Sequence, residues 1–152
     1  MADLSRERLA RAFWARHANP RSGWSRTVTL PVLVGAVVER RWRLFGLAVA
    51  FVVVNPVLFA PPDDADAWMT KVVLAERRWR ASGDDLGALR LLNVGNAAAT
   101  LSAFAAAYRR DVGGATVATA LAMTLKFAFV AALVRRYEDD LDAAELLGEP
   151  EP

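Results

Sequence analysis

"VGGATVATALAMTLKFAFVAALV", residues 112–134, is a run of apolar and small residues in which Lys126 is the only charged side chain. At 1.5 Å per residue, a helix over this run would be roughly 34 Å long, enough to cross a hydrocarbon core of about 30 Å. Two arginines flank the run on each side, at 109–110 and 135–136. The run therefore predicts a transmembrane helix.

Three more apolar blocks precede it, and the charged residues lie mainly between the blocks. Residues 86–108 match the fourth block in length. Residues 44–60 would reach about 25 Å and need snorkelling flanks or local thinning of the bilayer. Residues 27–38 would reach only about 18 Å, so whether they cross completely stays open. We predict an all-α membrane protein with four transmembrane helices, over 24–38, 44–60, 88–108 and 112–134.

Two amphipathic stretches complete the predicted fold. In residues 3–17, an apolar arc that includes Phe13 and Trp14 lies opposite arginines. In residues 63–80, Asp63 can cap a helix whose Trp68, Val72, Ala75 and Trp79 share one face. Both stretches are typical of helices that lie in the membrane interface. All five tryptophans fall outside the apolar blocks or at their edges, as in an aromatic belt.

The basic residues predict the orientation. With four crossings and the N-terminus inside, thirteen fall inside and five outside: Arg6, Arg8, Arg11, Arg16, Arg21, Arg26, Lys71, Arg77, Arg78, Arg80, Arg90, Arg135 and Arg136 against Arg40, Arg41, Arg43, Arg109 and Arg110. The positive-inside rule then puts both termini in the cytoplasm of a protein in the cell membrane. If the first block does not cross, the bias is smaller.

The length and composition limit the number of domains, the partners and the metal sites that the chain can have. The 152 residues form one predicted integral membrane domain, 1–152, ending in a solvated acidic tail over 138–152. A net charge of +2 argues against a nucleic-acid partner. The chain has one histidine and no cysteine, which argues against a His-rich or thiolate metal site. We expect no metal and no cofactor.

The sole histidine lies in "FWARHANPRSGWSR", residues 13–26. Pro20 disfavours helix at the preceding residue, so a helix should stop near Asn19, which with Pro20 suits the start of the next one. This structural reading leaves His17 unexplained. In the functional reading, Arg16, His17, Asn19 and Arg26 form a site for lipid headgroups or other anions. Catalysis by His17 is a further alternative.

Lys126 is the second candidate, because a cation at that depth costs about 3 kcal/mol on insertion scales. Its side chain tilts toward the outer end of its helix, so it cannot easily reach the nearer, inner interface. We therefore predict an intramembrane polar cluster of Lys126, Asn96, Thr100 and Asn55. The cluster either fixes helix pairing or carries a function.

Several segments together resemble one known family: residues 13–26, "NPVLFAPP", "AWMTKVVLAERRW" and "RRYEDD". The first follows the pattern Trp-x-Arg-His-x-Asn-Pro-x-Ser-x-Trp-x-Arg. The chain is similar over about residues 13–140 to a family of small prokaryotic integral membrane proteins of unknown function. It departs from the pattern at Arg21, where an aromatic residue is expected. The resemblance implies a multi-pass fold and supplies no activity.

Three functions remain open. The first is a non-enzymatic scaffold or accessory protein, with membrane lipids and a second copy of the chain as its expected partners. The second is a small anion transporter or channel that acts as an oligomer and uses Lys126. The third is a lipid-headgroup enzyme at the inner face that uses His17. No nucleophile elbow, Gly-rich phosphate loop or His-carboxylate pair is present in the sequence, so the first is preferred.

Overall fold

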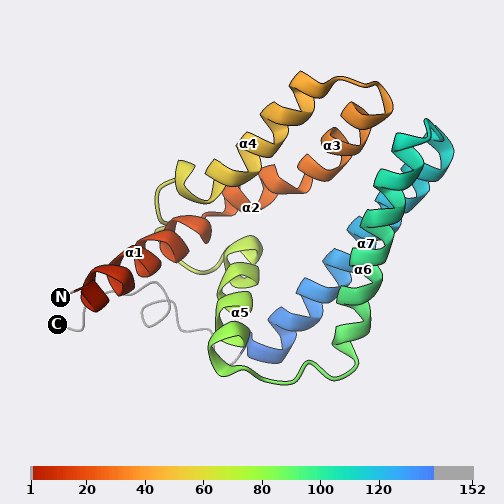
Figure 1. Ribbon diagram of the computed structural model, residues 1–152. Coiled ribbons are helices and arrows are strands. Elements are labelled where there is room, and N and C mark those ends of the chain that lie inside the picture. The colour runs from red at the N-terminus through yellow and green to blue at the C-terminus, as the bar shows by residue number, and fades with distance from the viewer. Residues whose placement is uncertain (1, 139–152) are drawn as a thin grey trace. The chain divides into compact units, whose positions relative to one another are not determined.

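The computed structural model describes residues 2–138, with side chains from residue 8 onward, and its regular structure is entirely α-helical (Figure 1). This confirms the predicted all-α fold class. Most of the acidic tail predicted at 138–152 lies outside the described residues. The chain divides into two compact units, with boundaries inside α2, α4 and α7 and in the α5–α6 loop.

The seven helices of the described part are α1 (Ala2–His17), α2 (Pro20–Thr27), α3 (Thr29–Val38), α4 (Trp42–Leu58), α5 (Trp68–Ser82), α6 (Leu89–Tyr108) and α7 (Val112–Tyr137). Unit 1 holds α1, most of α2, the end of α4, α5 and the end of α7. Unit 2 holds α3, most of α4, α6 and most of α7.

The predicted spans coincide with helices to different degrees. Segments 44–60, 88–108 and 112–134 correspond to α4, α6 and α7. Among the described residues, α7 is the one helix that is long and apolar enough to cross a membrane, while α4 is apolar but shorter. Helix α6 is long enough, but it carries Arg90, Asn93 and Asn96. The arrangement with four crossings therefore stays a prediction.

The segment predicted as one helix over 24–38 is two helices, which corrects that boundary. Helix α2 ends at Thr27 and α3 begins at Thr29. Pro31 supplies the physical reason, because its ring would clash with the Thr27 carbonyl if one helix continued through both. In the first turn of α3 the same proline is tolerated, since no intrahelical bond is needed from its nitrogen there.

The helix predicted over 63–80 begins later, and the predicted cap at Asp63 is wrong. Helix α5 begins at Trp68 after Ala67, with no side-chain cap. The Asp64 carboxylate accepts the Asp66 N–H at 3.0 Å, a local turn that competes with a helical start.

The predicted apolar face of α5 is covered by protein. Val72 is 7% exposed and Ala75 is fully buried, and the neighbouring Val73 and Leu74 are each 1% exposed. Because these side chains are already buried, they do not form a free face for lipid. The expectation that Val72 enters the membrane interface is wrong.

Unit 1 is built around α5. The hydroxyl of Thr70 donates to the Ala18 carbonyl at 2.9 Å, which satisfies the end of α1. Helix α2 lies close to α5 at Gly23, where a Cβ atom would lie 2.9 Å from the Cβ of Met69. A side chain larger than hydrogen does not fit there.

We predict that Gly23→Ala destabilises the protein by about 1–3 kcal/mol, because the Cβ of Met69 cannot move without its backbone. Gly35→Ala is the matched control, since a Cβ there meets no atom within 4 Å. It should stabilise α3 by about 0.5–1 kcal/mol. Thermal unfolding of both variants measures the difference, and equal effects would contradict the close approach of α2 to α5.

Unit 2 has a core of small and β-branched residues. Its buried members are Val34, Val37, Ala103, Ala107 and Ala115. The buried alanines of α6 recur every fourth residue, so they form one face, and α3 packs on α6. Figure 1 shows α6 and α7 side by side, and the amide of Asn96 donates to the Ala122 carbonyl at 2.8 Å. Small residues thus allow close packing along α6.

The turn between α3 and α4 and the turn between α6 and α7 have the same backbone geometry. Arg40 and Arg110 both have left-handed backbones, with φ of 57° and 60°. In the first turn the Arg41 N–H reaches back to the Ala36 carbonyl at 2.8 Å, and Asp111 makes the equivalent bond in the second. This is a Schellman turn, in which glycine normally takes the left-handed position.

We predict that Arg110→Gly stabilises the protein by about 1 kcal/mol, because it relieves the left-handed strain of an exposed residue. Arg40→Gly relieves the same strain. It also removes the guanidinium, which donates to the Tyr108 carbonyl at 2.7 Å and lies 4.6 Å from the Tyr108 ring centroid. Denaturant unfolding should show no net gain for Arg40→Gly, and an equal gain in both variants would show that this contact contributes nothing.

Candidate functional site

The Asn-Pro junction of residues 19–20 joins α1 to α2 and has the predicted cap. The side-chain oxygen of Asn19 accepts the Arg21 N–H at 2.8 Å, and Pro20 is the first residue of α2. Asparagine at the cap and proline at the first helical position are both favoured for this geometry. The structural part of the prediction for this stretch is confirmed.

Two residues of the predicted anion site bind backbone carbonyls. The Asn19 amide donates to the Ala60 carbonyl at 2.9 Å, and a guanidinium nitrogen of Arg16 donates to the Val57 carbonyl at 3.3 Å. These carbonyls lie at or just beyond the end of α4, where such groups have no partner within the helix. A cation there also interacts favourably with the helix dipole. Arg16 and Asn19 therefore hold α4 in place within unit 1.

His17 is packed among aromatic rings. It is 9% exposed, and its ring is stacked with Phe13 at 5.4 Å between centroids and edge-on to Trp14 at 5.7 Å. Arg26, the fourth predicted member, is half-buried and belongs to unit 2. Its carbonyl accepts the Thr29 hydroxyl at 2.6 Å. The structure thus brings Arg16, His17 and Asn19 together at the end of α1.

Asn55 belongs to a buried polar cluster that sequence reasoning did not foresee. Its amide oxygen accepts the Ser22 hydroxyl at 2.7 Å, and its amide nitrogen donates to the Ser25 hydroxyl at 2.8 Å. Ser25 in turn donates to the Ser22 carbonyl at 3.1 Å. Asn55 and Ser22 are both fully buried. The cluster joins α2 to the end of α4 within unit 1.

The other members of the predicted intramembrane cluster lie on α6 and α7 of unit 2. Asn96 bonds to the α7 backbone, as described above, and Thr100 is half-buried on α6. Lys126 is exposed, and its ammonium lies 5.5 Å from the centroid of the Phe129 ring. Its placement beside Asn96 and Thr100 stays a prediction.

The last two turns of α5 form an arginine-rich segment with no equivalent in the predicted sites. Arg77 follows the buried Val73 by four residues and Arg78 follows Leu74 by four, so both extend from faces that are buried one turn earlier. This four-residue spacing between apolar residues and arginines is the sequence pattern that could have indicated the segment. Burial, and then repulsion from Arg11, lower the pKa of the Arg77 guanidinium.

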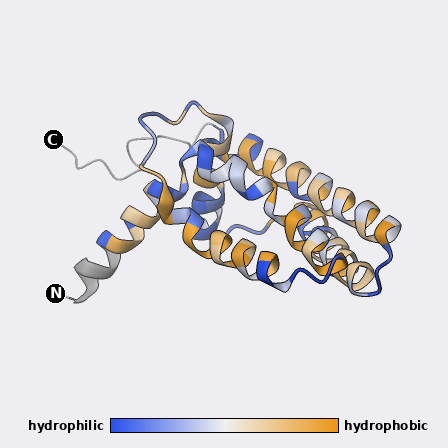
Figure 2. Cartoon of the chain, turned by 90° about the horizontal axis from the view of Figure 1, so that it is seen from above, coloured by the Kyte–Doolittle hydropathy of each residue, from blue (hydrophilic) through white to orange (hydrophobic). Residues whose placement is uncertain are grey.

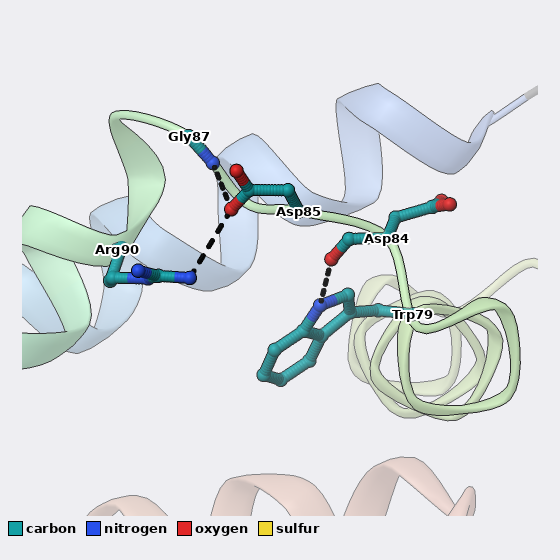
Figure 3. A network of polar contacts seen from close by, with 5 residues as sticks. All are labelled: Trp79, Asp84, Asp85, Gly87 and Arg90. Carbon is teal, nitrogen blue, oxygen red and sulfur yellow. Dashed lines mark hydrogen bonds and ion pairs between the residues drawn. The ribbon is translucent and has the colours of Figure 1, made fainter.

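The end of α5 is fixed by contacts to Asp84 within unit 1. Figure 3 shows the indole N–H of Trp79 donating to the Asp84 carbonyl, at 3.1 Å. The Tyr137 hydroxyl donates to the Asp84 carboxylate at 2.7 Å, and this bond lowers the pKa of the carboxyl group. The hydrogen bond from Tyr137 therefore stabilises the folded protein above the unfolded-state pKa of an aspartate, about 3.9. This stabilisation is lost as the pH falls through the lower folded-state pKa of Asp84.

In unit 2, Asp85 lies in the loop that leads into α6. Its carboxylate accepts the Gly87 N–H at 3.1 Å and pairs with Arg90 at 3.3 Å (Figure 3). Both charged side chains of this pair are mostly exposed. The pair therefore contributes little stability.

The described residues contain no group of three side chains able to hold a metal ion. The carboxylates and hydroxyl groups described above bond both to backbone groups and to other side chains, and the His17 ring packs on aromatic rings.

A family model described as a family of unknown function (DUF6653) matches residues 6–139. The chain belongs to this family. The match covers α1 from residue 6 and all six later helices, which confirms the resemblance to a family without an assigned activity. Among curated proteins and solved structures, nothing matches the chain.

We predict that Asn19→Ala destabilises unit 1 by about 1–2 kcal/mol, because it removes the α2 cap and the bond to Ala60. Asn19→Ser is the matched control, since serine is an equally good cap but its hydroxyl is too short to reach Ala60. It should lose roughly half as much. Thermal unfolding measures both, and a neutral Asn19→Ala would show that the junction does not hold the helices.

Proposed function

We propose that this protein is a non-enzymatic, multi-pass protein of the cell membrane that serves as a small scaffold or accessory subunit. Its membrane spans are residues 44–60, 88–108 and 112–134 and the segment 24–38, in which the end of α2 and α3 are separated near Val28. Both termini are cytoplasmic. The N-terminal helix α1 and the arginines of unit 1 meet lipid headgroups at the cytoplasmic face.

One observation carries the proposal: large apolar side chains are exposed along the helices of unit 2. Those more than 50% exposed are Val28, Trp42, Leu47, Val53, Leu91, Val94, Leu101, Tyr108, Val112, Val117 and Leu121. Figure 2 shows hydrophobic colour along these helices and hydrophilic colour at the turn that joins α3 to α4. A water-soluble monomer rarely exposes so much contiguous apolar surface, whereas a bilayer solvates it.

The exposed hydroxyl groups of the same helices support a lipid environment. Ser102, Thr116 and Thr124 each donate to the carbonyl four residues earlier in their own helix, at 2.8–2.9 Å. These three hydroxyl donors therefore have partners without water. This is how serine and threonine are accommodated in a membrane helix.

Helix α1 has the features of an interfacial helix more clearly than α5 does. Leu9 is 71% exposed and Phe13 39%, so part of its apolar arc is free. Trp24, at 53% exposure, adds an aromatic anchor at the entry to the first span. The interfacial role predicted for both helices is therefore proposed for α1 alone.

The two alternatives have less support. A transporter that uses Lys126 would hold it in a polar pathway, whereas its side chain is exposed beside Phe129. An enzyme that uses His17 would need that ring to reach a substrate, whereas it is 9% exposed between aromatic rings.

Single cysteines test the topology, because the chain has none of its own. We expect Arg43→Cys and Arg109→Cys to react with a membrane-impermeant maleimide in intact cells. Arg21→Cys and Arg135→Cys should react only after permeabilisation. All four replace exposed arginines, so they are matched in chemistry.

Two results would contradict the proposal. If Arg43→Cys reacts only after permeabilisation, residues 24–60 do not form two crossings. If the protein is found in the soluble fraction and all four cysteines react alike, the chain does not span a membrane.

A further inference from the structure

The seam between α1 and α5 in unit 1 gathers positive charge. Ala18 meets Thr70 at one end, and Trp14 meets Arg80 further along, with the guanidinium 5.6 Å from the ring centroid. Toward the same end, Arg11 of α1 lies within electrostatic range of Arg77. Two helices thus hold like charges close together.

Two guanidinium nitrogens near the end of α5 have no acceptor among the described residues, and one of them belongs to Arg77 at this seam. Nη1 of Arg77 and Nε of Arg78 are buried and have no hydrogen-bond partner in the described part of the chain. Buried donors are nearly always satisfied in folded proteins, so two open donors on neighbouring residues are unusual. Donors of an arginine fork are suited to oxyanions, which accept several hydrogen bonds at once.

The carboxylate of Asp84, which interacts with Arg78, is already engaged by another group. Asp84 interacts electrostatically with Arg78, but its carboxylate takes the short hydrogen bond from Tyr137. Arg136 is also within range of Asp84 and adds a further positive charge. The last two turns of α5 carry three arginines, Arg77, Arg78 and Arg80, and one carboxylate, Glu76.

We propose that Arg77, with Arg78 beside it and Arg11 across the seam, binds a phosphate-type oxyanion. A phosphate group offers several oxygens in a tetrahedral arrangement, so it can accept from donors that arrive from two helices. Arg77 and Arg78 are each only half-buried as whole side chains.

The site deepens the proposed function without depending on it. Its residues all lie in unit 1, so the binding of a phosphate group does not require unit 2 to span a membrane. The phosphate comes either from a lipid headgroup or from solution. Only the lipid source rests on the proposed cytoplasmic placement of unit 1, and the cysteine-labelling experiment tests that placement separately.

Binding is measured on the full chain in a neutral, phosphate-free detergent. Inorganic phosphate should raise the unfolding temperature saturably, because it binds the folded state alone. Arg77→Met should unfold at the same temperature as the wild type or higher without phosphate, since it removes an unsatisfied buried donor. It should weaken phosphate binding about tenfold or more. Arg77→Lys keeps the charge without the fork and should also weaken binding.

Arg109→Met is the matched control, because it removes an exposed arginine from unit 2 and should leave the affinity unchanged. Vesicles of phosphatidylglycerol and of phosphatidylcholine distinguish the sources. A dependence on Arg77 seen only with phosphatidylglycerol assigns a lipid headgroup, and one seen with inorganic phosphate assigns a free anion. If Arg77→Met does not fold, Arg77→Lys and Arg11→Met decide by the same affinity criterion.

The proposal is overturned if the wild type binds neither phosphate nor anionic vesicles. It is also overturned if Arg77→Met binds as tightly as the wild type, or if Arg109→Met loses as much affinity as Arg77→Met. The last result would mean that net charge alone attracts the anion.

Discussion

The buried amide of Asn55 holds unit 1 together. A polar group without access to water must find partners, and here the amide oxygen accepts from the Ser22 hydroxyl while the amide nitrogen donates to the Ser25 hydroxyl. Because those serines lie three residues apart on α2, a shift of α2 by one residue would leave the amide unsatisfied. The position of α2 also determines where Gly23 meets α5. A hydrogen-bond requirement thus sets the packing, and the small residue permits it.

The packing of unit 2 depends on a different constraint, the close approach of the backbones of neighbouring helices. The alanines at 99, 103 and 107 remove side-chain volume on one face of α6, and α3 packs on that helix. In a lipid environment, dispersion contacts of this kind replace the hydrophobic effect as the force that joins helices. The two Schellman turns then end the hairpins in the same way, although neither has glycine at the left-handed position. Arg40 offsets that strain by its contacts with Tyr108, and Arg110 shows no comparable offset.

Residue patterns predict the existence of most helices here but not what covers them. Length and composition place α4, α6 and α7, and the Asn19-Pro20 pair places the junction of α1 and α2, because both signals act locally. The break near Val28 follows from Pro31, which was readable as a local clash. The burial of Val72 was not readable, because an apolar helical face looks the same whether protein or lipid covers it. The partners of Asn55 are distant in sequence, so no local pattern indicates them.

The surroundings of the arginines explain why the proposed anion site lies at Arg77 on α5 and not near His17, where the sequence predicted it. Counting basic residues near His17 identified Arg16, yet its guanidinium is already bonded to a carbonyl at the end of α4. An exposed guanidinium that already bonds to a backbone carbonyl has less to gain from an anion than one with buried donors left open. Arg77 and Arg78 are in the second state. Charge alone attracts an anion over the range of a Debye length, but unsatisfied donors decide where it binds. For this reason the α1–α5 seam, rather than the Asn-Pro junction, is the better place to look for a ligand.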